Sequence, residues 1–176
     1  MPFIRPYNPS TNADGDAIAA IYGHHVLHGR ASFETEAPSA TEMRRRMAKI
    51  LEAGFPVLMA ELDGRVAGYA YAGPFHHRAA YAGTVEDSIY VDHSLARRGV
   101  GRALLSALID KLRADGLQQI MAVIGDSANA SSIELHRALG FREIGVARDI
   151  GFKFGGFVDV VYMQLPLQSS ANRPTD

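Results

Sequence analysis

The sequence predicts an α/β (α+β) protein in which helices flank a mixed central sheet. Two observations predict this class. Apolar residues repeat at helical spacing in four segments and at strand spacing between them. Some predicted strands follow one another through short turns, as antiparallel strands do, whereas others are separated by a helix, as parallel strands are. The 176 residues are 47% hydrophobic and 21% charged, which is typical of a soluble globular domain.

The first elements are predicted to be a short strand and two helices. Phe3–Arg5 is the strand, and a helix follows from Asp14 onward, with Asp14 or Asp16 as its N-terminal cap. The start of the second helix is marked by Ser39 and Glu42, because a Ser-x-x-Glu pattern before an apolar stripe is a capping box.

A hairpin and a third strand come next. Val57–Leu62 and Val66–Tyr71 are joined by Asp-Gly, a pair that favours a tight hairpin turn. The third strand is Thr84–Val91, which is rich in β-branched residues. Alternation divides its side chains between two faces, with Val85, Asp87, Ile89 and Val91 on one and Glu86, Ser88 and Tyr90 on the other.

The C-terminal half is predicted to alternate helices and strands. The expected elements are a helix over Gly101–Ala114 that Gly116 stops, a strand over Gln119–Ile124, a helix that starts at a capping box Ser131–Glu134, and strands over Phe141–Ala147 and Phe157–Leu165. We expect a single domain over residues 1–167 and a flexible polar tail over residues 168–176.

Composition excludes several kinds of function. The chain has no cysteine, which excludes disulfides, a cysteine nucleophile, a thiolate zinc site and an iron–sulfur cluster. A formal net charge of −1 gives no electrostatic reason to expect a nucleic acid or a membrane as a partner. Because residues 1–20 lack the pattern of a signal peptide and no apolar run reaches about 18 residues, we expect a cytoplasmic protein.

The segment after the third strand carries the most specific signal. A turn with Gly99 and Gly101 leads from that strand into a helix, and Arg97, Arg98 and Arg102 surround it. Backbone N–H groups at a helix N-terminus, together with arginines, bind phosphate. The turn lacks the Gly-Lys-Ser/Thr of a Walker loop and the third glycine of a dinucleotide fingerprint. Taken alone, it is also compatible with an ordinary connection that bears exposed arginines.

Two motifs extend this signal to a family. Arg98-Gly-Val-Gly-Arg-Ala103 resembles the R/Q-x-x-G-x-G/A signature of the GCN5-related N-acetyltransferase (GNAT) superfamily. About 30 residues later, Asn129–Phe141 resembles the second signature of that superfamily, which ends in Leu-Gly-Phe. The chain most resembles the phosphinothricin and methionine sulfoximine acetyltransferase branch. The segments that carry this resemblance are Ala31–Glu36, Gly68–Phe75, Arg78–Tyr81, Thr84–Glu86, Val123–Gly125, Gly151–Gly155 and Asp159–Val161.

The resemblance implies a GNAT fold and acetyl-CoA as co-substrate. In that fold two central strands splay apart, here Thr84–Val91 and Gln119–Ile124, and the pantetheine arm lies in the split. The implied cofactor-binding residues are Ile89, Val91, Arg97, Arg98, Gly99, Val100, Gly101, Arg102, Asn129 and Ser132. The resemblance also implies a homodimer with active sites near its interface.

Two residues are candidates for proton transfer. Glu86 lies in an apolar strand, where partial burial raises the pKa of a carboxylate towards that of a useful base. His136 stands where many members of the superfamily have a tyrosine that acts as acid, and its ordinary pKa suits a base at neutral pH. The alternatives without a catalytic role are a solvated strand glutamate for Glu86 and a packed helix histidine for His136. Which of the two is the base, and what acts as acid, stays open.

The resemblance assigns a second group of residues to an amino-acid-like substrate. Arg78 and Tyr81 are placed at the substrate, and a guanidinium suits its carboxylate. Phe33, Val123 and Gly125 are candidates for the pocket wall. The alternatives are an exposed loop arginine for Arg78 and core packing for Phe33. We predict no metal, because the histidine pairs of the sequence lack a clear carboxylate partner.

Together these observations predict an acetyl-CoA-dependent N-acetyltransferase that acts on the α-amino group of a small amino-acid-like substrate. Phosphinothricin, methionine sulfoximine and methionine sulfone are the leading candidates. Because there is no cysteine to carry the acetyl group, we expect direct transfer in a ternary complex. The alternatives are another acceptor amine, such as a polyamine or a peptide N-terminus, and a non-catalytic acyl-CoA-binding module.

Overall fold

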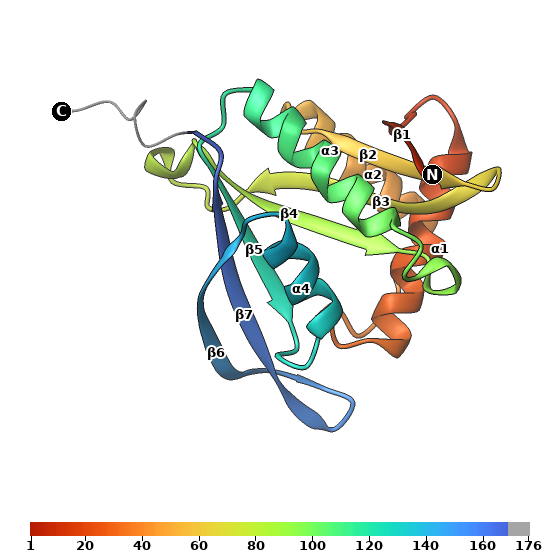
Figure 1. Cartoon of the computed structure of the whole chain (residues 1–176). Coiled ribbons are helices and arrows are strands. Elements are labelled where there is room, and N and C mark those ends of the chain that lie inside the picture. The colour runs from red at the N-terminus through yellow and green to blue at the C-terminus, as the bar shows by residue number, and fades with distance from the viewer. Residues whose placement is uncertain (169–176) are drawn as a thin grey trace.

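The computed structural model of the protein describes residues 1–168 (Figure 1). The strands are β1 (Phe3–Pro6), β2 (Val57–Leu62), β3 (Arg65–Pro74), β4 (Thr84–Val91), β5 (Gln119–Gly125), β6 (Arg142–Lys153) and β7 (Gly156–Pro166). The helices are α1 (Asn12–His28), α2 (Ala40–Glu52), α3 (Val100–Ala114), α4 (Ala130–Ala138) and the short 3₁₀ turns η1 (Ala79–Tyr81) and η2 (His93–Leu95). The predicted tail lies, from residue 169 on, outside the described residues, so its flexibility and the domain boundary at residue 167 stay predictions.

The strands form one seven-stranded mixed sheet in the order β1-β2-β3-β4-β5-β7-β6. Each neighbouring pair is antiparallel except β4 and β5, which are parallel. Helices α1 and α2 cover one face, and α3 and α4 cover the other (Figure 1). The apolar stripes of the helices bury two separate cores, one on each face, so the predicted mixed sheet with flanking helices is confirmed.

The parallel pair in the centre of the sheet separates. Thr84–Asp87 pairs with Gln119–Ala122, and no pairing joins the two strands beyond these four residues. From this point Ser88–Val91 follows β3 while Val123–Gly125 follows β7, and the two ribbons diverge (Figure 1). The splay predicted between these strands is confirmed, and it leaves backbone groups of β4 without a strand partner.

Two predicted helix caps are wrong. Helix α1 starts at Asn12, and Asp14 lies in its first turn, where its carboxylate accepts two hydrogen bonds of 2.7 Å from Arg5 and one of 2.8 Å from the Asn8 backbone N–H. Asp16 instead forms an ion pair with Arg44. A guanidinium fork satisfies both carboxylate oxygens of Asp14, which explains why it is buried beside β1 rather than turned back to cap the helix.

Helix α4 starts one residue before the predicted capping box. Asn129 is its cap and accepts a hydrogen bond of 3.3 Å from the Ser132 backbone N–H, whereas Ser131 lies in the first turn and donates to the Asn129 side chain. The predicted cap at Ser39 is confirmed, since its hydroxyl accepts from the Glu42 backbone N–H at 3.2 Å, but the Glu42 carboxylate bonds to Arg45 and Arg46 and does not complete the capping box. The last hairpin is longer than predicted, because Phe154 and Gly155 adopt the two positive φ angles of a tight turn.

No helix in residues 1–168 is both long enough and apolar enough to cross a membrane.

Candidate active site

A cavity of about 1120 Å³ opens where β4 and β5 diverge. Its walls come from the loop after α1, from the unpaired half of β4, from the turn before α3, and from the start of α4. The predicted site residues that line it are Phe33, Glu86, Ile89, Val91, Arg97, Gly99, Val100, Gly101, Arg102, Val123, Gly125, Asn129, Ser132 and His136. The fold therefore brings most of the predicted residues to one place, and only Arg98, Arg78 and Tyr81 do not line this cavity.

Strand β4 presents backbone groups to the cavity. The Asp92 backbone N–H donates to the Ala67 carbonyl at 2.9 Å, which fixes which residues of β4 bond to β3. By the alternation of an antiparallel pair, the N–H and C=O groups of Ile89 and Val91 point the other way, into the split. The Val91 carbonyl accepts a hydrogen bond of 2.8 Å from His25 Nε2, so the N–H groups and the Ile89 carbonyl are the ones left for a ligand.

The turn before α3 has the conformation of an anion-binding site. Arg97 and Gly99 both have positive φ, 63° and 80°, and α3 begins at Val100, so the N–H groups of its first turn have no acceptor within the helix and belong to residues that line the cavity. Arg97 and Arg102 add positive charge there. Arg98 instead forms an ion pair of 2.8 Å with Asp63 in the β2–β3 turn, which gives it a partner away from the cavity.

The N-terminal end of α4 forms the facing wall. Asn129 Nδ2 lies 3.5 Å from the Gly125 carbonyl, and its Oδ1 caps the helix, so the side chain joins β5 to α4. Gly101 of α3 faces this wall, and an added Cβ there would lie 3.2 Å from Leu135 Cδ2. Glycine at that position lets α3 and α4 approach closely at the mouth of the split.

Glu86 points to the face of β4 that lies opposite the α3 and α4 side. It is half-buried, and no hydrogen bond or ion pair to another described residue holds its carboxylate. Burial raises the pKa of Glu86, and the negative charge of Asp87 adds to the increase. A carboxylate with a raised pKa and free oxygens in a ligand cavity has the properties of a general base.

His136 is buried and has partners on both ring nitrogens. Nε2 lies 3.0 Å from Asp87 Oδ2, and Nδ1 lies 2.7 Å from the Ser132 carbonyl. Burial lowers the pKa of His136, but the hydrogen bond and the charge of Asp87 raise it, and the net effect is an increase. Our sequence analysis did not select Asp87, although the signal was present: it is the acidic residue on a strand face that is otherwise apolar.

The wall opposite the anion-binding turn is built on Phe33. Its ring lies over two glycines, because a Cβ added to Gly125 or Gly151 would come within 3.1 Å and 1.9 Å of it. The loop that carries it is held by Lys153, whose buried ammonium donates to the Gly29 and Ser32 carbonyls at 2.8 and 2.7 Å. Lys153 is a second residue that the sequence analysis missed as a contributor to the site.

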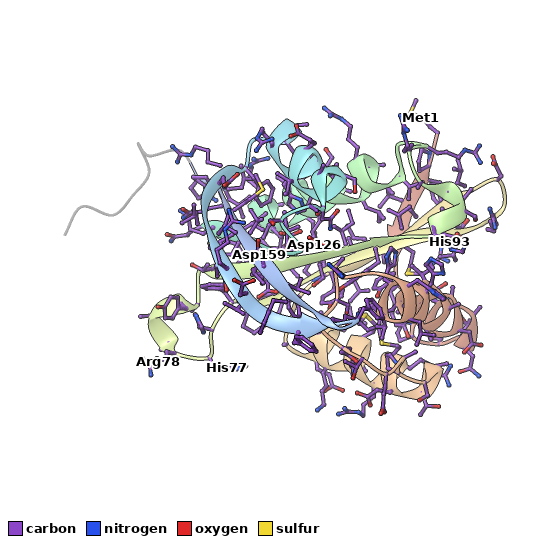
Figure 2. All side chains as sticks on the ribbon, turned by 90° about the horizontal axis from the view of Figure 1, so that it is seen from below. Met1, His77, Arg78, His93, Asp126 and Asp159 are labelled. Carbon is purple, nitrogen blue, oxygen red and sulfur yellow. The ribbon has the colours of Figure 1, made fainter. Side chains whose placement is uncertain are left out.

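Arg78 and Tyr81 lie elsewhere. They are on or beside η1, in the loop between β3 and β4, and both are exposed. Figure 2 shows Arg78 and His77 on a loop that projects from the body of the chain, far from His93 at the other end of β4. Within one chain, therefore, the fold does not bring Arg78 to the cavity that holds Glu86.

The histidines of α1 and η2 form an aromatic cluster. The rings of His24 and His93 are stacked at 3.7 Å, and His28 lies 4.8 Å from His24. Among residues 1–168, no three histidine, aspartate or glutamate side chains are arranged to hold a metal ion.

A family model described as an acetyltransferase (GNAT) domain matches residues 9–162. The chain belongs to the GNAT acetyltransferases. The resemblance predicted from Arg98–Ala103 and Asn129–Phe141 is confirmed, and so is the prediction that the protein is an N-acetyltransferase.

This GNAT acetyltransferase is similar to proteins of the predicted branch. A phosphinothricin N-acetyltransferase of Alcaligenes faecalis is 49% identical over 156 residues, which cover 89% of this chain and 79% of that protein. An L-methionine sulfoximine/L-methionine sulfone acetyltransferase of Salmonella typhimurium is 39% identical over 164 residues, 90% of this chain and 92% of that one. A crystal structure of a phosphinothricin acetyltransferase from Sinorhizobium meliloti, in complex with AcCoA, superposes with a TM-score of 0.91 at 42% identity, covering 99% and 94% of the two chains.

Proposed function

We propose that this protein transfers an acetyl group from acetyl-CoA to the α-amino group of a small amino-acid-like substrate of the phosphinothricin, methionine sulfoximine or methionine sulfone type. The observation that carries the proposal is the single cavity in which Glu86, the unpaired backbone of β4 and the anion-binding turn meet. The substrate class follows the names of the relatives from Alcaligenes faecalis and Salmonella typhimurium, which match almost the whole chain.

The residues of the cavity fit acetyl-CoA. When bound, it supplies an acetyl group activated as a thioester. The first turn of α3, with Arg97 and Arg102, offers N–H donors and positive charge to its pyrophosphate. The unpaired groups of Ile89 and Val91 offer the pantetheine amides a strand edge to bind. Arg98 is paired with Asp63, so it can contact a phosphate only when that ion pair breaks.

The chemistry requires a neutral amine and donors for an oxyanion. We assign the first task to Glu86, which takes the proton of the substrate ammonium directly or through a water. The Ile89 N–H, which points into the split, is suited to the oxyanion of the tetrahedral intermediate. Since the chain has no cysteine, it cannot form an acetyl-cysteine intermediate, and we propose direct transfer in a ternary complex.

We propose that the active unit is a homodimer. Exposed apolar side chains gather on the hairpin of β6 and β7, and these are Ile144, Ile150, Phe152, Phe154 and Phe157. An apolar surface of this kind is suited to a second copy. In such a dimer, Arg78 and Tyr81 of one subunit would contact the substrate in the partner's cavity.

The cytoplasmic location stays a prediction from the sequence.

A panel of amines with acetyl-CoA tests the proposal. Because the protein has no thiol of its own, a thiol reagent reports only the coenzyme A that is released. We expect turnover of methionine sulfoximine, methionine sulfone or phosphinothricin, and loss of about 10²–10⁴-fold in kcat for Glu86→Gln. The matched control is Glu143→Gln, an exposed glutamate on β6 that should keep the wild-type rate. Turnover of polyamines alone, or binding of acetyl-CoA without turnover of any amine, would contradict the proposal.

A further inference from the structure

Asp87 and His136 form a buried pair at the point where the sheet opens. Asp87 is the last residue of β4 that pairs with β5, opposite Ala122. Its side chain and that of His136 are each 2% exposed, and both line the cavity. The pair therefore sits at the closed end of the split, on the face of β4 opposite to Glu86.

The hydrogen bonds of His136 determine how many protons the pair holds. A backbone carbonyl only accepts, so Nδ1, 2.7 Å from the Ser132 carbonyl, must carry a hydrogen. Nε2, 3.0 Å from Asp87 Oδ2, then shares a second proton with the carboxylate. Without that second proton, a lone pair would face a carboxylate oxygen in a buried site, which is unfavourable. The pair thus holds one proton more than a neutral imidazole beside an ionised carboxylate would hold.

The other charged groups around the pair leave Asp87 as its dominant partner. Strand β5, which packs beside β4, has no titratable side chain over Gln119–Gly125. From β4 itself, Glu86 points to the opposite face. Phe141, which follows α4, contributes an aromatic edge at 4.9 Å from the His136 ring. Arg102 of α3, which lines the cavity, is exposed, and so are Glu134 and Arg137, the charged residues next to His136 along α4.

Asp87 has a second feature that points to a ligand. Its Oδ1 is buried and has no hydrogen-bond partner among the described residues, although it lies in the wall of the cavity. A buried carboxylate oxygen without a donor is unfavourable, so we expect Oδ1 to gain a donor when the cavity is filled. The pair is therefore turned towards the bound reactants as well as towards α4.

We propose that Asp87 is a positioning residue that holds a proton on His136, so that His136 protonates the leaving sulfur while Glu86 acts as the base. This inference rests on the proposed function. In the balanced reaction, the amine nitrogen forms a bond to the acetyl carbon as the carbon–sulfur bond breaks. Glu86 passes the ammonium proton to solvent before the attack and then takes the second proton of the nitrogen. The Nε2 proton of His136 leaves its hydrogen bond with Asp87 Oδ2 and goes to the thiolate. Asp87 then favours reprotonation of His136 from solvent, which resets the site.

A measurement without substrates tests the protonation state. In the ¹⁵N spectrum of the unliganded protein, with His136 assigned by comparison with His136→Gln, we expect both ring nitrogens to be protonated at pH 7. In Asp87→Asn the charge that holds the second proton is gone, so His136 should be neutral at the same pH. A neutral His136 in the wild type, or an unchanged spectrum in Asp87→Asn, would overturn the proposal whether or not the protein acetylates the substrates named above.

The pH profile of kcat/KM tests the role. An acid must be protonated, so the alkaline limb should move to lower pH in Asp87→Asn, with a loss of about tenfold on the alkaline side for each unit of displacement. Loss of the Asp87 charge also moves the acid limb slightly to lower pH, because that charge contributes to the raised pKa of Glu86. The alkaline limb is therefore the criterion, and an alkaline limb that stays in place would refute the assignment.

His136→Gln provides the second variant. If His136 is the acid, this variant loses the alkaline limb and keeps the acid limb that Glu86 sets. If His136 is the base, it loses the acid limb instead, and the proposal fails. Asp87→Glu, which keeps the charge, should recover part of the wild-type profile, and thermal unfolding of each variant identifies a loss of folding. A wild type without turnover would refute the proposed function, while the ¹⁵N spectrum would still decide the role of Asp87.

Discussion

Glu86 and Asp87 are adjacent carboxylates with opposite surroundings. Glu86 has no bonded partner among the described residues and is half-buried, so its pKa is raised and it can exchange a proton. Asp87 is buried against His136, with its Oδ2 3.0 Å from the imidazole Nε2. One residue of displacement along a strand reverses the face. The two faces differ in burial and in partners, which is why we propose a base for one carboxylate and a positioning role for the other.

Lys153 gives a residue-scale prediction for the wall of the substrate pocket. Lys153→Met removes the donor that fixes Gly29 and Ser32, and it leaves two carbonyls without a partner, at a cost of about 1–3 kcal/mol in folding stability. Because Phe33 is carried by the same loop, we expect KM for the amine to rise about tenfold while KM for acetyl-CoA is unchanged. Steady-state kinetics with each substrate varied in turn check this. An equal change in both constants would contradict it.

At the scale of elements, β4 organises the site. Its first half pairs with β3 and β5 and positions Glu86 and Asp87. Its second half has β3 as its only strand partner and offers a free edge. The transition coincides with the start of the cavity. A strand that changes from central to edge strand within eight residues supplies both rigid side chains and open backbone groups.

The junction of β1 and α1 gives an element-scale prediction about stability. The hydrogen bonds from Arg5 lower the pKa of Asp14, so the stabilisation is present above the pKa of the unfolded chain and is lost as pH falls through the folded one. We expect Asp14→Asn to lose about 2–3 kcal/mol at pH 7. The difference between variant and wild type should shrink below about pH 4. Urea unfolding at pH 7 and pH 3 measures it, and a difference that does not depend on pH would be inconsistent with this role.

At the scale of the whole molecule, the proposed homodimer relates the cavity to the β3–β4 loop. Arg78 and Tyr81 do not line the cavity of their own chain, and the hairpin of β6 and β7 carries exposed apolar side chains. Both features are accounted for by one arrangement, in which a second copy covers the hairpin and receives the loop of its partner.

A mixture of two inactive variants tests this arrangement. Glu86→Gln and Arg78→Ala each disable both sites of a homodimer, but a mixed dimer has one site with an intact Glu86 and an intact Arg78 from the other subunit. After joint refolding, about a quarter of the wild-type activity should return, since half of the dimers are mixed and each has one intact site. Activity no higher than that of the separate variants would show that Arg78 does not act across an interface. Phe157→Glu should yield a monomer in sedimentation, and the mixture should then stay inactive.

Much of the fold and part of the site could be predicted because the signals are local. The Ser39 cap, the Asp-Gly hairpin turn and the alternation along Thr84–Val91 each depend on residues within one element, and each is confirmed. The predicted caps at Asp14 and Ser131 are wrong because a competing partner came from elsewhere: Arg5 on β1 for Asp14, and the preceding Asn129 for α4. The contacts of Asp87 and Lys153 likewise depend on distant residues, since their partners are 49 and 121 or more residues away, although the place of Asp87 on an apolar strand face could have singled it out.

The sequence by itself determined the family, the class of reaction and the position of the glycine turn before α3, because these depend on motifs whose residues are neighbours in the chain. Tertiary structure alone decided which arginine of the turn is already paired, which carboxylate is free and which one holds His136. These properties depend on burial and on contacts between distant segments, and local spacing does not encode them.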